Sequence, residues 1–237
     1  MKKLSRKTTY VCNAILLSLI AIVFAVSFLP QRAVYIYGGS SDGAIYKGNA
    51  LKNNVSLMFN VYENTDVVCD IVDVLDARGV KATFFVGGCW ADDNEQTLCK
   101  IAKSGHEIGN HGYFHKSHTK LDYGGNEKEI SNNHSVVKAL CGVEMNLFAP
   151  PSGDFSALTI EVASALNYKV IMWSKDTIDW RDSNQNLVYS RATKNLSNGD
   201  LILMHPKKHT LEVLDRIIDY IENADFKIVT VSENIAD

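Results

Sequence analysis

Short apolar runs alternate along this chain with longer segments whose apolar residues recur at helical spacing. Runs rich in β-branched and aromatic residues indicate strands, and apolar residues three to four positions apart indicate helices. The pattern predicts seven strands, over residues 55–59, 81–86, 106–109, 145–148, 169–173, 200–204 and 227–231. Between them it predicts six helices, over residues 66–78, 94–104, 126–140, 156–166, 187–195 and 210–223.

Strands that alternate with helices at this spacing favour a parallel sheet covered by helices. Runs such as LILM at 201–204 do not alternate with polar residues, which is typical of strands buried on both faces. On this pattern alone, a barrel and an open doubly wound sheet are both possible. The residues that follow the strands must decide between them.

The amino-terminal 30 residues have a different pattern from the rest. The run from Val11 to Leu29 is apolar except for Asn13, and it follows a cluster of Lys and Arg. About 20 apolar residues suffice to cross a bilayer, and upstream positive charge keeps the amino end in the cytoplasm. We therefore predict a cytoplasmic basic stub and an uncleaved transmembrane signal anchor over residues 1–30. The expected localisation is the cell membrane, with a single pass and the carboxyl-terminal domain outside the cytoplasm.

Two alternatives remain for this segment. A cleaved signal peptide would leave a secreted protein, and a buried core helix would leave the segment inside the fold. In each export interpretation, residues 31–50 form a linker or lead-in, and residues 51–237 form the folded domain.

Composition changes this picture in one respect. The net charge is −3, but four of the 24 Lys and Arg residues lie in the first nine positions, which leaves 20 against 27 acidic residues in the remainder. Affinity for nucleic acid depends mainly on positive charges that neutralise phosphates. Nucleic acid is therefore not an expected partner.

The cysteines leave two interpretations open. Cys69, Cys89, Cys99 and Cys141 lie in the predicted domain. Export would permit disulfides, for which four cysteines allow three full pairings, whereas small buried hydrophobic residues are the alternative. Their spacing matches no zinc motif of the CxxC type.

Polar residues suited to metal binding or acid–base chemistry follow four of the predicted strands: His111 and His115, Ser152, Asp176 and Asp179, and His205. Two histidines at i and i+4 lie on one side of a helical turn, so both rings can reach one metal ion. The carboxyl ends of parallel strands meet at one edge of the sheet, where α/β proteins bind ligands. A shared site is expected there. His118, His134 and His209 are expected at the surface.

The order of these motifs resembles the polysaccharide deacetylase family, also called the NodB-homology domain or carbohydrate esterase family 4. KATFFV at 81–86, GHEIGNH ending at His111, DTIDW at 176–180, ILMH ending at His205 and KIVTVSE at 227–233 carry the resemblance. It covers residues 55–232, nearly the whole predicted domain. The resemblance implies a distorted (β/α)7-type barrel and hydrolysis of N-acetyl groups on polysaccharide, such as peptidoglycan or a chitin-like glycan, at a divalent metal, usually zinc.

The resemblance also assigns roles. His205 matches the general acid and Asp179 the carboxylate that orients it, with Asp176 as a helper of His205 or of a loop. His111 and His115 match metal ligands. Trp180 and Leu203 match walls of the acetyl pocket, and the backbone N–H of Ser152 matches the oxyanion donor.

The departures from the family pattern concern the other half of the site. The family's T-F-D-D-G motif aligns with MFNVY, which places Asn60 at the catalytic base and Val61 at the metal-binding aspartate. Ala149 stands where an arginine pairs with that base, and an arginine facing Asn60 would be a buried charge without a partner. Glu63 or Asp66 could replace a lost carboxylate, and Asp66 is the expected third ligand, although the first turn of a helix also favours an acidic residue there.

Three functions follow. The first is a membrane-anchored, metal-dependent deacetylase of cell-wall or related polysaccharide. The second is a catalytically impaired relative that binds glycan or scaffolds cell-wall assembly. The third is a different hydrolase on the same scaffold, in which Glu63 or Asp66 supplies the third ligand or the base.

Overall fold

The computed structural model describes residue 18 and residues 42–236. The chain divides into two units, residues 1–35 and 36–237, and the second contains the folded domain. The predicted anchor over residues 11–29 lies, apart from Ser18, outside the described residues. Among the helices that the structure describes, none is both long and apolar enough to cross a membrane.

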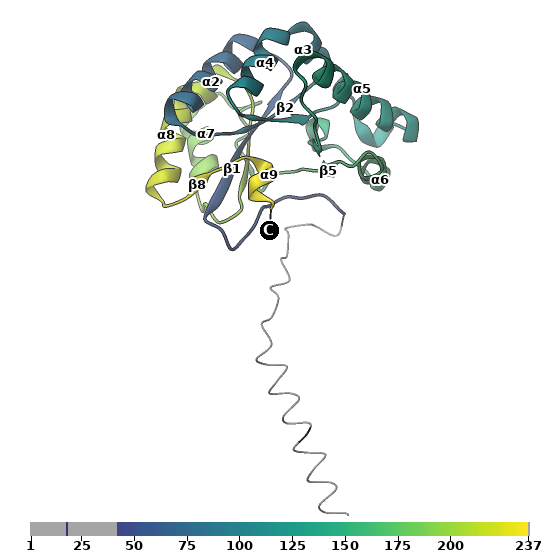
Figure 1. The fold of residues 1–237 in the computed structure, drawn as a ribbon. Coiled ribbons are helices and arrows are strands. Elements are labelled where there is room, and N and C mark those ends of the chain that lie inside the picture. The colour runs from purple at the N-terminus through teal and green to yellow at the C-terminus, as the bar shows by residue number, and fades with distance from the viewer. Residues whose placement is uncertain (1–17, 19–41, 237) are drawn as a thin grey trace, which may run out of the picture. The chain divides into compact units, whose positions relative to one another are not determined.

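The domain is built on a parallel sheet whose strands run in the order β5-β4-β3-β2-β1-β7-β6, with β8 pairing with β1 (Figure 1). The strands are β1 (Asn54–Val61), β2 (Thr83–Val86), β3 (Glu107–Asn110), β4 (Leu147–Phe148), β5 (Lys169–Val170), β6 (Lys175–Asp176), β7 (Leu201–Met204) and β8 (Lys227–Ile228). Each of these strand pairings is parallel. The sheet fits the seven-stranded barrel that the sequence predicts.

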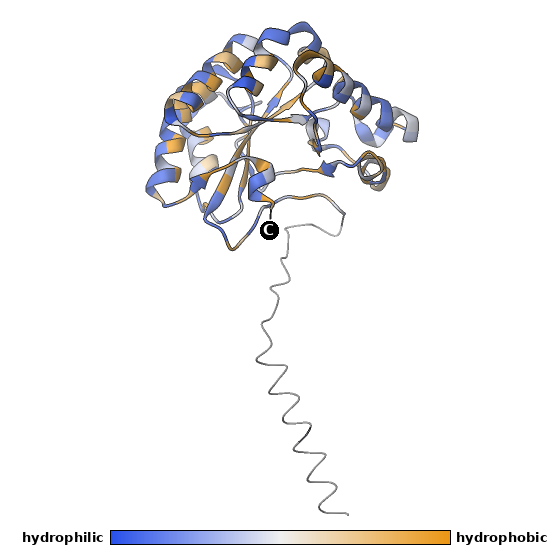
Figure 2. Ribbon diagram, viewed as in Figure 1, coloured by the Kyte–Doolittle hydropathy of each residue, from blue (hydrophilic) through white to orange (hydrophobic). Residues whose placement is uncertain are grey.

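Helices pack against the sheet, and hydrophobic and hydrophilic residues alternate along them in short stretches (Figure 2). They are α2 (Thr65–Arg78), α3 (Gly88–Asp93), α4 (Glu95–Lys103), α5 (Tyr123–Cys141), α6 (Ala157–Ala165), α7 (Gln185–Thr193), α8 (Lys208–Asn223) and α9 (Val231–Asn234), with short 3₁₀ turns η1 (His118–Lys120) and η2 (Pro151–Gly153). In α8, for example, Leu214, Ile217, Ile218 and Ile221 are fully buried. Their spacing of three and four residues places them on one helical face.

Two apolar clusters lie on opposite faces of the strands. Met58 belongs to a small cluster inside the barrel, whereas Phe59 and Val61 belong to the large cluster between sheet and helices. Successive side chains of a strand point to opposite faces. Asn60 therefore shares the inward face with Met58, and Val61 points into the outer core.

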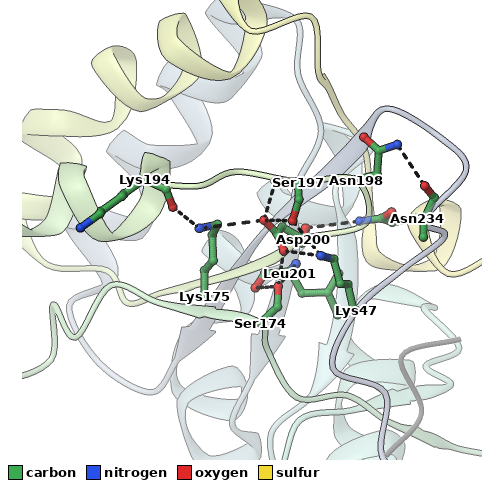
Figure 3. A network of polar contacts seen from close by, with 10 residues as sticks. Lys47, Ser174, Lys175, Lys194, Ser197, Asn198, Asp200, Leu201 and Asn234 are labelled. Carbon is green, nitrogen blue, oxygen red and sulfur yellow. Dashed lines mark hydrogen bonds and ion pairs between the residues drawn. The ribbon is translucent and has the colours of Figure 1, made fainter.

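The lead-in before β1 packs onto the barrel from residue 42 onward. Ile45 forms a parallel bridge with Ile171, just beyond β5, and Lys47 forms an antiparallel bridge with Asp200, just before β7. Asp200 is 3% exposed. Figure 3 shows its carboxylate within a network of contacts that includes Lys47 at 3.3 Å, Ser174 at 2.9 Å and the Ser197 backbone N–H at 2.8 Å. The lead-in thus joins the two sides of the open sheet.

The structure differs from the sequence-based expectation in three places. The predicted helix over residues 94–104 is preceded by a separate helix, α3. The two-residue strand β6 has no apolar run and was not predicted. The last strand ends at Ile228, and Thr230 begins α9 with a capping box, in which the Thr230 hydroxyl accepts from the Glu233 N–H and the Glu233 side chain accepts from the Thr230 N–H.

Candidate active site

A cavity of about 410 Å³ opens at the carboxyl ends of the strands. Its lining comes from the last residues of β1, β6 and β7 and from the loops after β1, β3, β4, β5, β6 and β7. The lining residues are Asn60, Tyr62, Glu63, His111, His115, Ser152, Trp173, Asp176, Trp180, Leu203, His205, Pro206 and Lys207. Most of the residues that the sequence singled out are therefore brought together. Asp179 lies behind His205, and Asp66 does not line the cavity.

His205 and Asp179 form a closely coupled pair. The Nδ1–H of His205 donates to Asp179 Oδ1, and the His205 backbone N–H donates to Oδ2, each over 2.7 Å. Thr210 donates a further hydrogen bond of 2.7 Å to Oδ2. Burial raises the pKa of Asp179, but the hydrogen bonds and charge of His205 outweigh it, and the pKa lies below its ordinary value. Because Nδ1 is engaged, Nε2 of His205 is the nitrogen left for a ligand.

His111 and His115 lie side by side, with ring centroids 5.1 Å apart. His111 Nδ1–H donates to the carbonyl of Ala149 over 2.7 Å, which fixes the ring and leaves Nε2 as a free acceptor. Burial, followed by the neighbouring His115, lowers the pKa of His111 to about 3. Burial also lowers the pKa of His115. Both rings are therefore neutral at pH 7, the form that binds a metal.

A buried polar face of α5 holds the loop that carries these histidines. Asn133 Nδ2 donates to the side chain of Asn110 and to the carbonyl of Gly112, over 2.9 and 3.2 Å. Glu129, 3% exposed, accepts from the backbone N–H of Phe114 over 2.8 Å. The sequence analysis missed these residues. The sequence pattern that could have identified them is the spacing of Asn126, Glu129 and Asn133, which places these polar side chains on one face of the predicted helix.

The expectation for His118 was wrong. It is fully buried, with its ring 4.9 Å from that of Phe148 and Nδ1 2.6 Å from Asn126 Oδ1. His118 therefore packs inside the domain, whereas a surface position was expected. His118 is the first residue of η1, and its side chain is buried there.

The three positions at which the resemblance expects the base, the metal-binding aspartate and the arginine carry no charged side chain. Asn60 is 5% exposed, and its Oδ1 is buried without a hydrogen-bond partner. Val61 and Ala149 are both fully buried. The inner cluster contains Ala149 with Met58, so the methyl group of Ala149 lies among apolar neighbours.

The family pattern implies a divalent metal, and the residues present supply only part of a site for it. A catalytic zinc has three protein ligands and one open position. His111 and His115 fit two of these, but Val61 offers no donor atom, and Asp66 is exposed in the first turn of α2. Among residues 42–236, no group of three or more His, Cys, Asp or Glu side chains is placed to hold a metal ion. A complete three-ligand site does not fit this cavity.

The predicted substrate residues also lie at the cavity. Trp180 is 55% exposed, Leu203 is buried, and Ser152 lies in η2 with φ 56°. Asp176 accepts a 2.7 Å hydrogen bond from the backbone N–H of Ile178, so it holds its own loop. The roles that the resemblance gives these residues stay predictions.

Four lining residues, Tyr62, Trp173, Pro206 and Lys207, were not predicted from the sequence. Trp173 follows β5 at the same edge as the other site residues. Tyr62 packs on His115 with a ring-centroid distance of 4.8 Å. Lys207, expected to be solvated, forms an ion pair with Glu63 at the cavity. Their common signal was position just after a strand.

The cysteines are free thiols in the described domain: Cys69, Cys89, Cys99 and Cys141 are each half-buried. The thiols are thus less buried than the alternative of small buried hydrophobic residues expects.

Comparison with known proteins agrees with this geometry. The family model described as polysaccharide deacetylase matches residues 47–171, just over half of the chain. The uncharacterized protein YlxY of Bacillus subtilis is 37% identical over 189 residues, which cover 80% of this chain and 59% of YlxY. A peptidoglycan-N-acetylglucosamine deacetylase of Bacillus cereus is 28% identical over 191 residues, covering 78% of this chain and 70% of that protein.

Solved structures give the same result. A CE4 family pseudoenzyme from Bacillus anthracis has a TM-score of 0.80 at 29% identity, with 83% of this chain and 70% of that chain covered. A mutant of that pseudoenzyme with restored enzymatic activity also has a TM-score of 0.80, at 28% identity, covering 83% and 72% of the two chains. With the barrel, the His205–Asp179 pair and the histidine loop, these matches place the chain in the polysaccharide deacetylase family.

Proposed function

We propose that this protein binds N-acetylated cell-wall polysaccharide in the cavity and that its deacetylase chemistry is impaired by the missing base. The observation that carries the proposal is Asn60, whose amide stands where the family has a carboxylate. An amide cannot take a proton at neutral pH, and a positioned general base is typically worth about 10²–10⁴-fold in rate.

The rest of the site supports retention of ligand binding. Hydrolysis of an acetamide needs a base to activate water, an oxyanion donor and an acid to protonate the departing amine. Here His205, oriented by Asp179, keeps the geometry of the acid. Trp180 offers an exposed aromatic face at the cavity, which suits the apolar face of a sugar ring. The pocket that would hold an N-acetyl sugar thus remains, while the group that would start the reaction is absent.

The comparisons support the same proposal. The Bacillus cereus relative is named for activity on peptidoglycan N-acetylglucosamine. The Bacillus anthracis structures are of a pseudoenzyme of the same family. Because the chain spans 59% of YlxY, the activity and partners of the whole protein remain part of the proposal.

A second candidate is a slow metal-dependent deacetylase. The intact His205–Asp179 pair favours it, since a binding protein has no need of an oriented acid. His111 and His115 would hold the divalent metal ion in a weak site with two protein ligands. Zinc is the first ion to test.

The proposal includes a location. The apolar run over residues 11–29, preceded by four basic residues, supports a membrane anchor with the domain outside the cytoplasm. Cell fractionation and protease accessibility of the full chain would test it. Full-length protein in the soluble fraction would contradict the anchor, and a secreted shorter form would indicate a cleaved signal peptide.

The test of function measures binding and acetate release in parallel. The full chain is titrated with an N-acetylglucosamine tetramer by calorimetry, and acetate is assayed in the same samples. We expect binding without appreciable acetate release. Trp180→Ala should weaken binding, whereas Tyr123→Ala, which removes an exposed aromatic ring away from the cavity, should not.

The opposite outcomes are distinct. Rapid acetate release by the wild type would replace the binding proposal with the deacetylase. Failure of the tetramer and of peptidoglycan fragments to bind would refute the proposed function.

A further inference from the structure

The ion pair between Glu63 and Lys207 joins two loops at the cavity. Glu63 follows β1 and Lys207 follows β7, and the two strands are neighbours in the sheet. Both side chains line the cavity. An exposed ion pair adds at most about 1 kcal/mol to stability, so fold stability alone gives little reason for this one.

The two partners differ in their access to water. The Glu63 side chain is 57% exposed, whereas that of Lys207 is 25% exposed. If the pair opens, the carboxylate is readily hydrated, but the ammonium group still needs a partner. Another carboxylate can therefore take the place of Glu63 at little cost. A neutral hydroxyl would not replace the lost charge.

The other charges at the cavity do not prevent this exchange. Among the described residues that line the cavity, Lys207 is the only Lys or Arg. The lining also contains Asn60, whose side chain carries no charge. Asp176 is the remaining carboxylate in the lining, and one of its oxygens is held by the backbone N–H of Ile178. An anion at Lys207 thus meets less negative charge than the family pattern would present.

We propose that Lys207 selects glycans that carry a carboxylate next to the N-acetylated sugar, with Glu63 as the anion that the ligand displaces. This inference rests on the proposed function, because it concerns the same cavity. The carboxylate could belong to a lactyl ether on the sugar, as in N-acetylmuramic acid, or to a peptide attached to it. Either source provides the same planar, singly charged acceptor for the ammonium group.

Three probes separate these sources in calorimetric titrations of the full chain. They are a neutral N-acetylglucosamine tetramer, a tetrasaccharide of alternating N-acetylglucosamine and N-acetylmuramic acid with free lactyl groups, and the same tetrasaccharide with its peptides attached. The wild type should bind a carboxylate-bearing probe more tightly than the neutral tetramer, by at most about fivefold, because one partly exposed ion pair is worth no more than that and the ligand must first displace Glu63. Tighter binding of the second probe identifies the lactyl group, and tighter binding of the third alone identifies the peptide.

Three variants test the roles of the two side chains. Lys207→Met should remove the preference, so that the charged probes and the neutral tetramer bind the variant with similar affinity. Glu63→Gln should increase affinity for the charged probe, because the competing carboxylate is gone. Lys208→Met is the matched control, since Lys208 is exposed, lies next in sequence and does not line the cavity; it should behave as the wild type.

The outcomes separate this inference from the proposed function. Equal wild-type affinity for neutral and charged probes, or equal weakening of both by Lys207→Met, would overturn the role of Lys207 while leaving glycan binding intact. Lack of binding by every probe would overturn the proposed function and this inference with it. Thermal unfolding of each variant shows that the fold is retained, and Glu63→Gln gives an independent answer if Lys207→Met does not fold.

Discussion

The Asp179 carboxylate accepts two hydrogen bonds from a single residue, one from the backbone N–H of His205 and one from its ring. The carboxylate thereby fixes both the position of the loop after β7 and the tautomer of the imidazole. Since Asp179 is 1% exposed, it cannot be hydrated in exchange for these bonds. The acid half of the site is thus also part of the packing of the barrel.

Asp179→Asn should lower the free energy of unfolding by about 3 kcal/mol, the order found when one partner of a buried pair is removed. The pKa of Asp179 is lowered in the folded protein, so its contribution is present above the unfolded pKa of about 3.9 and is lost as the pH falls through the folded value. Urea unfolding at several pH values checks this. The wild type should lose more stability than the variant below about pH 4.

Asp66→Asn is the control for that experiment, because it makes the same chemical change at an exposed position. Equal effects of the two substitutions would show that the His205 pair contributes no special stability.

Restoration of the base should raise deacetylase activity. Asn60→Asp, Val61→Asp and Ala149→Arg together supply the base, the third ligand and the arginine partner of the family pattern. General-base catalysis allows a gain of up to about 10²–10⁴-fold over a weak background. Acetate release from N-acetylglucosamine oligomers measures it.

Asn60→Asp alone should gain less, because its carboxylate lacks the arginine that keeps it charged and oriented. A different result would assign the base to Asp66. In that case the wild type is already active, Asp66→Ala abolishes the activity, and the triple variant is no faster than the wild type. If neither wild type nor triple variant releases acetate, loss of these three groups is not what impairs the site.

Val61→Asp alone should destabilise the domain. Val61 is fully buried in the outer core, where a new carboxylate has no partner in the described structure. The expected cost is about 3 kcal/mol or more. Zinc should recover part of it if the carboxylate reaches His111 and His115, and thermal unfolding with and without zinc measures this. A zinc-independent melting temperature would show that the new side chain stays in the core.

The wild type should bind zinc weakly through its two imidazoles, with lower affinity than a three-ligand site. His111→Ala combined with His115→Ala should abolish that binding, as followed by competition with a chromogenic chelator. His209→Ala is the control, because His209 bonds to the Asp179 carbonyl and does not line the cavity. One equivalent of zinc retained by the double variant would refute the assignment of these ligands.

Much of the fold could be predicted because the spacing of apolar residues within each segment indicates whether it forms a helix or a strand and which side it buries. The stripe of apolar residues in 210–223 requires a helix against a sheet, and LILM requires a strand buried on both faces. β6 could not be predicted, since Lys175 and Asp176 owe their strand geometry to pairing with Ile202 and Leu203. The sequence around them has no strand pattern of its own.

The site divides in the same way. His111, His115 and His205 could be predicted because polar residues directly after apolar strands converge at one edge of a parallel sheet. The ion pair of Glu63 with Lys207 could not, because residues 144 positions apart meet only once the register of β1 and β7 is known. Likewise, Glu129 reaches the histidine loop through the tertiary placement of α5.

The bridge made by the lead-in has a consequence for synthesis on the ribosome. Ile45 and Lys47 emerge early, yet their partners Ile171 and Asp200 come far later, and Gly48 lies against Asn234 near the end of the chain. Contacts so distant in sequence form slowly and late. Until residues 201–204 are made, the edge of β1 that pairs with β7 remains unpaired, and another chain could join it. A chain interrupted before residue 200 should therefore tend to aggregate, even though most of its sheet has already been made.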